Sequence, residues 1–123
     1  MSKKKCKVIE CIEYLSVDAP LYKVNRLEDK QSRYIREYAK GNYVRIVGTI
    51  RRNGFSMNDV NRQWERIAQK IRKKQVDGVI VANMAVISRD LPDAYWKVGK
   101  IKEAGGFIVT VDEGRLGMDI KEL

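Results

Sequence analysis

The stretch DGVIVANM, residues 77 to 84, decides how this chain folds. Its centre is a short, nearly continuous apolar run, which is typical of a β-strand that is covered on both faces. Strands of that kind belong to parallel sheets, in which helical crossovers cover the two faces. The stretch therefore predicts an α/β protein with helices on both sides of a sheet.

Three further segments have the pattern of strands. Residues 7 to 17 (KVIECIEYLSV) and 43 to 50 (YVRIVGTI) alternate apolar and polar side chains, and the first of these strands is expected to end near Ser16. Residues 106 to 114 (GFIVTVDEG) are expected to form the last strand. Each strand is separated from the next by a segment with helical periodicity.

The first helix is predicted within residues 25 to 41, NRLEDKQSRYIREYAKG. We expect Asn25 to cap its start, with Glu28 three residues further on, and Gly41 to end it. The apolar residues expected to face inward are Leu27, Tyr34, Ile35 and Tyr38. Its outer face is heavily charged.

Two more helices follow. Met57, Val60, Trp64, Ile67 and Ile71 recur at intervals of three and four, which predicts a helix through residue 74. A third helix is expected after a cap at Asp90, and Gly105 would close it. The residues expected to face inward from that helix are Tyr95, Val98 and Ile101.

Strands that alternate with helices predict parallel pairing and right-handed crossovers. We therefore expect a three-layer α/β fold with a mainly parallel sheet of about four to five strands, flanked by helices. The predicted core includes Trp64, Ile67, Ile71, Val79, Val81, Val98, Ile101, Ile108 and Val109. Residues 1–123 are expected to form a single domain, with a basic arm at 1–6 and a short tail at 115–123.

The charge balance favours an anionic partner. The chain has 25 Lys and Arg against 16 Asp and Glu, which gives a net charge of +9. Nucleic acid is a better candidate than a membrane, although many cationic proteins are merely soluble. The opening MSKKKCK is not a signal peptide, because Glu10 and Glu13 interrupt the apolar stretch that follows it. We expect a cytoplasmic protein without membrane contact.

The composition also limits the chemistry. The chain has no histidine, so any catalysis must use hydroxyl, carboxylate, amine or guanidinium groups. Neither a Gly-Lys-Ser phosphate loop nor a G-x-G-x-x-G motif follows a predicted strand. No cofactor and no metal site is expected.

Ligands of parallel sheets bind beyond the carboxyl ends of the strands. The loops at those ends, which follow Ser16, Ile50, Met84 and Val111, carry a hydroxyl at Ser16, the basic glycine loop IRRNGFSMNDVNR at residues 50 to 62, and Arg89. A serine with converging arginines is a plausible phosphodiester site, because guanidinium groups bind phosphate oxygens bidentately. The alternative is structural, in which Ser16 ends a strand, Arg62 solvates a helix face and Arg89 lies near a cap.

The order of these pieces resembles the catalytic domain of serine recombinases, the resolvase and invertase family. That family has a first strand that ends in Tyr-x-Arg-Val-Ser, which IEYLS (12 to 16) resembles, so Ser16 lies at the nucleophile position. EDKQSRYIREYA (28 to 39) resembles the family's next helix, with Gln31 on its glutamine. NGFSMNDVNR (53 to 62) resembles the glycine-serine loop and places Arg62 on a catalytic arginine. MAVISRD (84 to 90) resembles the family's Asp-Arg-x-x-Arg-Asp segment.

The resemblance implies roles for individual residues. The implied catalytic residues are Ser16, Arg62 and Arg89. The residues implied to bind phosphate or DNA are Arg51, Arg52, Ser56 and Gln31. The family's reaction is DNA cleavage and rejoining through a phosphoserine link, and its implied partners are DNA and an intact recombinase or a second copy of this chain.

The departures from the family pattern concern the same site. Tyr14 replaces the arginine of the first strand, Arg52 stands where an acidic residue is common, and Met57 replaces the second loop glycine. Ala85 and Val86 replace an Asp-Arg pair, which leaves Arg89 as half of a two-arginine phosphate clamp. We therefore expect a degenerate recombinase domain with weak or no cleavage and a DNA-associated or regulatory role.

Two further points stay open in the sequence. Only RLGMDIKEL follows Gly114, so the family's long dimer helix and separate DNA-recognition domain are not expected in this chain. The sequence does not decide between a piece of a longer protein and a minimal, stand-alone domain. The alternative function is a non-catalytic basic α/β domain that binds RNA or another acidic partner. Whether any enzymatic activity remains is not decided by these residues.

Overall fold

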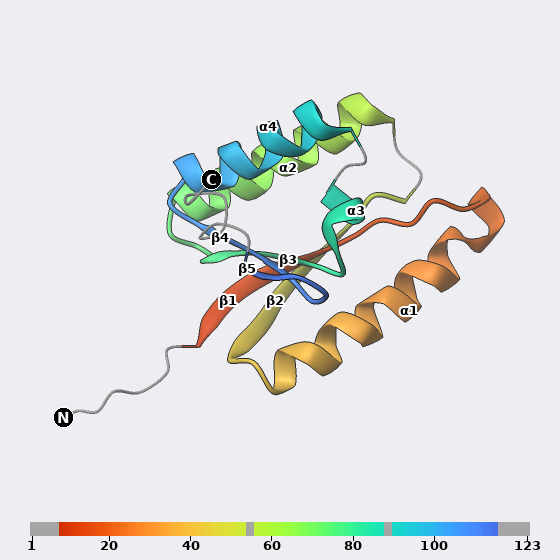
Figure 1. Ribbon diagram of the computed structural model, residues 1–123, viewed down its shortest axis with the longest axis horizontal. Coiled ribbons are helices and arrows are strands. Elements are labelled where there is room, and N and C mark those ends of the chain that lie inside the picture. The colour runs from red at the N-terminus through yellow and green to blue at the C-terminus, as the bar shows by residue number, and fades with distance from the viewer. Residues whose placement is uncertain (1–7, 54–55, 88–89, 116–123) are drawn as a thin grey trace.

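The computed structural model describes residues 8–53, 56–87 and 90–115, which form three layers (Figure 1). Within these ranges the middle layer is a 5-stranded sheet in the order β2-β1-β3-β4-β5. The strands are β1 (Ile9–Leu15), β2 (Val44–Arg51), β3 (Gly78–Val81), β4 (Phe107–Thr110) and β5 (Gly114–Arg115). All neighbouring pairs are parallel except β4 and β5. The expected mainly parallel α/β fold is confirmed.

Helices cover both faces of this sheet. Helix α1 (Leu21–Lys40) lies on one face, while α2 (Met57–Arg72) and α4 (Leu91–Glu103) lie side by side on the other (Figure 1). The single turn α3 (Met84–Ile87) follows β3. Each face has its own apolar cluster, the larger of which lies beneath α2 and α4.

The central strand β3 confirms the prediction from residues 77 to 84. All of its residues are buried, as expected for a strand with neighbours and helices on every side. It is shorter than predicted, because Met84 already belongs to α3. A Cβ atom at Gly78 would lie 2.3 Å from the carbonyl oxygen of Phe107, so the backbones of β3 and β4 approach more closely there than a side chain permits.

The predicted core is confirmed, since all nine of its residues are buried. Two tyrosines that were expected to face inward are exposed instead, Tyr34 on α1 and Tyr95 on α4. Ala94 and Lys97 take the inward positions of α4 together with Val98 and Ile101. Helical spacing predicts which residues share a face of a helix. It did not decide whether Tyr95 belongs to the buried face of α4 or to the adjacent exposed face.

The start of α1 differs from the prediction. The helix begins at Leu21 with Pro20 at the cap position, so Asn25 is an exposed residue within the helix and does not cap it. Glu28 does not complete a capping box either, because its buried carboxylate accepts a hydrogen bond from the Asn53 backbone N–H at 3.1 Å. Glu28, which the sequence pattern placed in a helix cap, instead contacts a residue far away in the sequence. Its end at Gly41 is confirmed.

The last predicted strand divides into two. Strand β4 ends at Thr110, a turn covers 111–113, and β5 returns antiparallel with Gly114 opposite Thr110. The Thr110 hydroxyl accepts a hydrogen bond from the Glu113 N–H at 3.0 Å, which closes this turn. In the described parts of the chain, no helix is both long and apolar enough to cross a membrane.

The approach of β3 to β4 gives a stability prediction. Gly78→Ala should lower the free energy of unfolding by about 1–3 kcal/mol, because the new methyl group would overlap the Phe107 backbone. Gly99→Ala is the matched control, since a Cβ at Gly99 meets nothing within 4 Å and alanine is the better helix former by about 0.5–1 kcal/mol. Urea denaturation of both variants measures the effects. If Gly78→Ala and Gly99→Ala had equal unfolding free energies, the close packing of β3 against β4 would be contradicted.

Candidate functional site

A hollow of about 570 Å³ lies beyond the carboxyl ends of β1 and β3, where the fold class predicts a ligand. Its walls come from the segments that follow β1 and β2, and from α1, α2, α3 and α4. Its polar and apolar lining includes Ser16, Gln31, Arg52, Asn83, Val86 and Lys97. Residues far apart in the sequence therefore meet at one edge of the sheet.

The main chain of Ser16 is held by one side chain. The Ser16 N–H donates to Oε1 of Gln31 at 2.8 Å, and Nε2 of Gln31 donates back to the Ser16 carbonyl at 3.0 Å. This pair of hydrogen bonds ties α1 to the end of β1 and leaves the Ser16 hydroxyl outside the exchange. The sequence identified both residues, but their contact depends on the position of α1 against the sheet.

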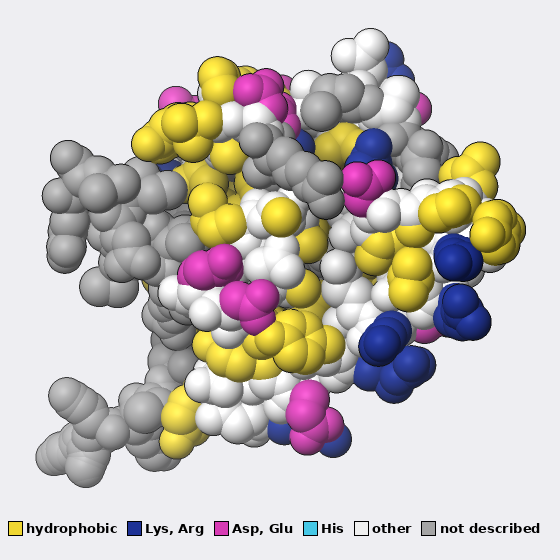
Figure 2. Space-filling model, turned by 45° about the vertical axis from the view of Figure 1, so that its right-hand side comes forward, with side chains coloured by type: hydrophobic (Ala, Val, Ile, Leu, Met, Phe, Trp, Pro, Cys, Tyr) yellow, Lys and Arg dark blue, Asp and Glu magenta, His cyan; other side chains and the backbone are white. Residues whose placement is uncertain are grey.

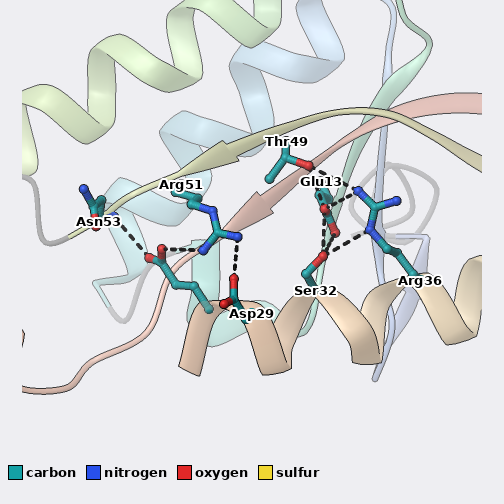
Figure 3. Close-up of polar contacts among 8 residues, drawn as sticks. Glu13, Asp29, Ser32, Arg36, Thr49, Arg51 and Asn53 are labelled. Carbon is teal, nitrogen blue, oxygen red and sulfur yellow. Dashed lines mark hydrogen bonds and ion pairs between the residues drawn. The ribbon is translucent and has the colours of Figure 1, made fainter. Parts of the chain in front are cut away.

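The two arginines at the end of β2 have different surroundings. Arg51 pairs with Asp29 at 2.6 Å and approaches Glu28 at 3.7 Å, so acidic residues of α1 neutralise it (Figure 3). Arg52 lines the hollow, and its backbone N–H donates to the Leu15 carbonyl at 2.8 Å. Of these two residues, Arg52 is the one placed to meet a ligand beside Ser16.

Ser56 directly precedes α2, and Arg62 lies within it. Ser56 caps this helix by accepting from the Asp59 N–H at 3.4 Å. The Arg62 side chain is 75% exposed, pairs with Asp59 at 3.4 Å and does not line the hollow. Arg89, the third residue with an implied catalytic role, lies outside the described residues. The structure thus brings together Ser16, Gln31 and Arg52, and it places Arg51, Ser56 and Arg62 elsewhere.

Tyr14 belongs to the apolar core. Its hydroxyl donates to Oε1 of Gln63 at 2.7 Å, and its ring centroid lies 5.3 Å from that of Trp64. Burial raises the pKa of the Tyr14 hydroxyl well above its ordinary range, so this group stays neutral. An arginine at this position would place its charge against the Trp64 ring. Ala85 and Val86 do line the hollow, and neither has a charge.

The sequence did not identify Lys97 as a site residue. It lies on α4, is 2% exposed and reaches the lining of the hollow. Its Nζ donates to the Ile87 carbonyl at 2.7 Å and pairs with Asp93 at 2.7 Å. The signal that could have identified it is a lysine on the apolar face of a helix, four residues after an aspartate.

A second polar cluster lies between α1 and the sheet. The Glu13 carboxylate, which is buried in β1, accepts from the Ser32 hydroxyl at 2.9 Å, from the Thr49 hydroxyl at 2.7 Å and from Arg36 at 2.8 Å (Figure 3). The cluster fixes the rotation and height of α1 on the sheet. Within residues 8–53, 56–87 and 90–115, no group of three or more His, Cys, Asp or Glu residues is arranged to hold a metal ion.

Comparison with known families identifies the family of this chain. Residues 23–122 match the family model described as "Resolvase, N terminal domain". The chain belongs to the resolvase N-terminal domain family. No curated protein matches it.

Solved structures share this resolvase fold. A resolvase family site-specific recombinase from Streptococcus pneumoniae is 21% identical with a TM-score of 0.71, over 86% of this chain and 74% of that one. The N-terminal catalytic domain of TP901-1 integrase is 18% identical with a TM-score of 0.67, over 90% of this chain and 87% of that one. At these identities the likeness establishes the fold.

Glu28 gives a pH prediction for the contact between α1 and the loop after β2. Burial raises the pKa of this carboxyl, against the opposing effects of the Asn53 N–H and Arg51. Its contribution to stability is present below the unfolded pKa of about 4.3 and is lost as pH rises through the folded pKa. Glu28→Gln stays neutral, so its unfolding free energy minus that of the wild type should grow from pH 4 to pH 8. Urea denaturation of both proteins across this pH range measures the difference in unfolding free energy. A difference that stays constant or shrinks as pH rises would contradict the raised pKa of Glu28.

Proposed function

We propose that this resolvase-family domain binds DNA through backbone phosphates at the Ser16 hollow, with little or no strand cleavage. The observation that supports binding is the convergence of Ser16, held by Gln31, with the cationic side chain of Arg52. Guanidinium groups stay charged at any working pH and match phosphate oxygens bidentately. The net charge of +9 would attract the polyanion from a distance.

The same hollow supports the absence of cleavage. A serine hydroxyl is a weak nucleophile at neutral pH, and the chain has no histidine to activate it. The family pattern implies arginines at the reacting phosphate in the positions of Tyr14 and Val86, but Tyr14 belongs to the core and Val86 presents an apolar side chain. Removing one preorganised group of this kind commonly costs about 3–4 kcal/mol of transition-state stabilisation, or several powers of ten in rate for two groups.

A regulatory role follows from binding without chemistry. Such a domain could occupy DNA beside an intact recombinase, or associate with that recombinase or with a second copy of itself. A cytoplasmic location, where DNA is accessible, is part of this proposal. The phosphate contact itself depends only on residues of the hollow, so it does not require a particular protein partner.

A second candidate is binding of RNA or another acidic partner through a diffuse basic surface. Lys and Arg side chains gather beside helix α1 in the view of Figure 2. The exposed basic residues of that helix are Arg26, Lys30, Arg33, Arg36 and Lys40. Binding there would depend on total charge and not on Ser16 or Arg52. The two candidate functions therefore differ in which arginine side chains contribute to the affinity for nucleic acid.

The affinity test compares two arginine variants. Arg52→Gln should weaken binding to a labelled DNA duplex by about tenfold, because it removes a charged phosphate contact, while Arg33→Gln removes the same charge from the outer face of α1 and should have a much smaller effect. Fluorescence anisotropy at two salt concentrations measures both. Equal losses would favour the diffuse basic surface over the hollow.

The chemical test looks for a covalent link to DNA. After incubation with supercoiled plasmid and denaturation in detergent, the wild-type protein should give no more protein-linked or nicked DNA than Ser16→Ala. The reason is the absence of charge at Tyr14 and Val86 and of any histidine in the chain that could activate the hydroxyl. An adduct formed by the wild type and missing from Ser16→Ala would contradict the absence of cleavage and support an active recombinase.

A further inference from the structure

The ion pair of Lys97 and Asp93 is an unusual feature of the wall beneath the hollow. Lys97 is 2% exposed although lysine is almost never fully buried without a partner. Its Nζ lies 2.7 Å from the Asp93 carboxylate, 2.7 Å from the Ile87 carbonyl oxygen and 5.9 Å from the centroid of the Trp64 ring. The charge is thus held by one anion, one carbonyl and one aromatic face.

Stability alone is a weak reason for this pair. Removing two ions from water costs several kcal/mol, and a buried pair is often no better than apolar side chains of similar volume. The neighbours of Lys97 along the inner face of α4, Ala94 and Val98, are apolar and buried. A methionine at position 97 would continue that apolar face.

The position of Lys97 indicates a role in the hollow. Among the described lining residues, Arg52 and Lys97 carry positive charge, whereas Asp18 and Asp90 carry negative charge. An ammonium group has three N–H donors, and among the residues that the structure describes, the Asp93 carboxylate and the Ile87 carbonyl engage at most two of them. Lys97 therefore has both charge and donor capacity for an anion that enters beside Ser16.

We propose that Lys97 binds a phosphate oxygen in the hollow and that Asp93 is the internal anion that holds the lysine charge when no phosphate is present. This inference rests on the proposed function and names a second phosphate-binding residue for it. Phosphate and Asp93 then compete for one ammonium group. Removing the lysine and removing the aspartate should change binding in opposite directions, which a purely structural ion pair would not do.

The test uses the full chain and a labelled DNA duplex over a series of salt concentrations. Lys97→Met should lower the affinity about tenfold and make the slope of log affinity against log salt shallower by about 1, as expected for one lost phosphate contact. Asp93→Asn should raise the affinity at low salt. Lys100→Met is the matched control, because Lys100 lies on the same helix and pairs with Glu65 away from the hollow.

A second measurement guards against unfolded variants. Asp93→Asn leaves a buried ammonium unpaired, so its melting temperature should fall, and inorganic phosphate should recover more of this loss than chloride at equal ionic strength. Lys97→Met leaves the Asp93 carboxylate without its cation, so its melting temperature should also fall, but inorganic phosphate should raise it no more than chloride does. Lys97→Arg keeps the charge and should retain most of the affinity.

The outcomes separate this inference from the proposed function. If Lys97→Met leaves DNA affinity unchanged while Arg52→Gln lowers it, the hollow binds phosphate and the role of Lys97 is wrong. If Lys97→Met and Asp93→Asn both weaken binding to the same degree, the pair is structural and the inference is again wrong. If neither Arg52→Gln nor Lys97→Met alters the affinity, the proposed function fails together with it.

Discussion

The two hydrogen bonds between the Gln31 amide and the main chain of Ser16 are the contact on which the arrangement of the hollow depends. They connect the carboxyl end of β1 to α1, which covers one face of the sheet (Figure 1). Because a side-chain amide offers both a donor and an acceptor, it can pair with the N–H and the C=O of one residue in a single orientation. Val17 and Asp18, which follow Ser16, line the hollow together with Arg52.

Helix α1 is held against the sheet by charge as well as by apolar packing. Glu13 in β1 engages Ser32 and Arg36 of the helix, and Glu28 of the helix approaches Arg51 at the end of β2 (Figure 3). A buried carboxylate is costly unless donors surround it, so these contacts fix the register of α1 more strictly than apolar side chains would. The neutralised Arg51 and the hollow-lining Arg52 are consequences of the same arrangement.

The sequence predicted the sheet and its core because both follow from periodicity. The apolar run at 77 to 84 and the spacing from Trp64 to Ile71 each allowed one interpretation. The site was predicted less well, because side-chain direction depends on tertiary contacts. Glu28 resembled half of a capping box but binds Asn53 across the layers, and Arg62 has the expected spacing in sequence but pairs with Asp59 on the exposed side of α2. Lys97 was missed because a lysine is ordinarily assigned to the solvent-facing side of a helix.

The central claim is that the hollow at Ser16 is the place where this domain contacts backbone phosphate. Amide chemical-shift mapping with a short DNA duplex, and separately with inorganic phosphate, tests it most directly. The account predicts that both ligands shift the same signals, those of Ser16, the Gln31 side-chain amide, Arg52 and Asn83, and that the shifts weaken with added salt. Shifts confined to the outer face of α1, with the Ser16 and Gln31 signals unchanged, would contradict it.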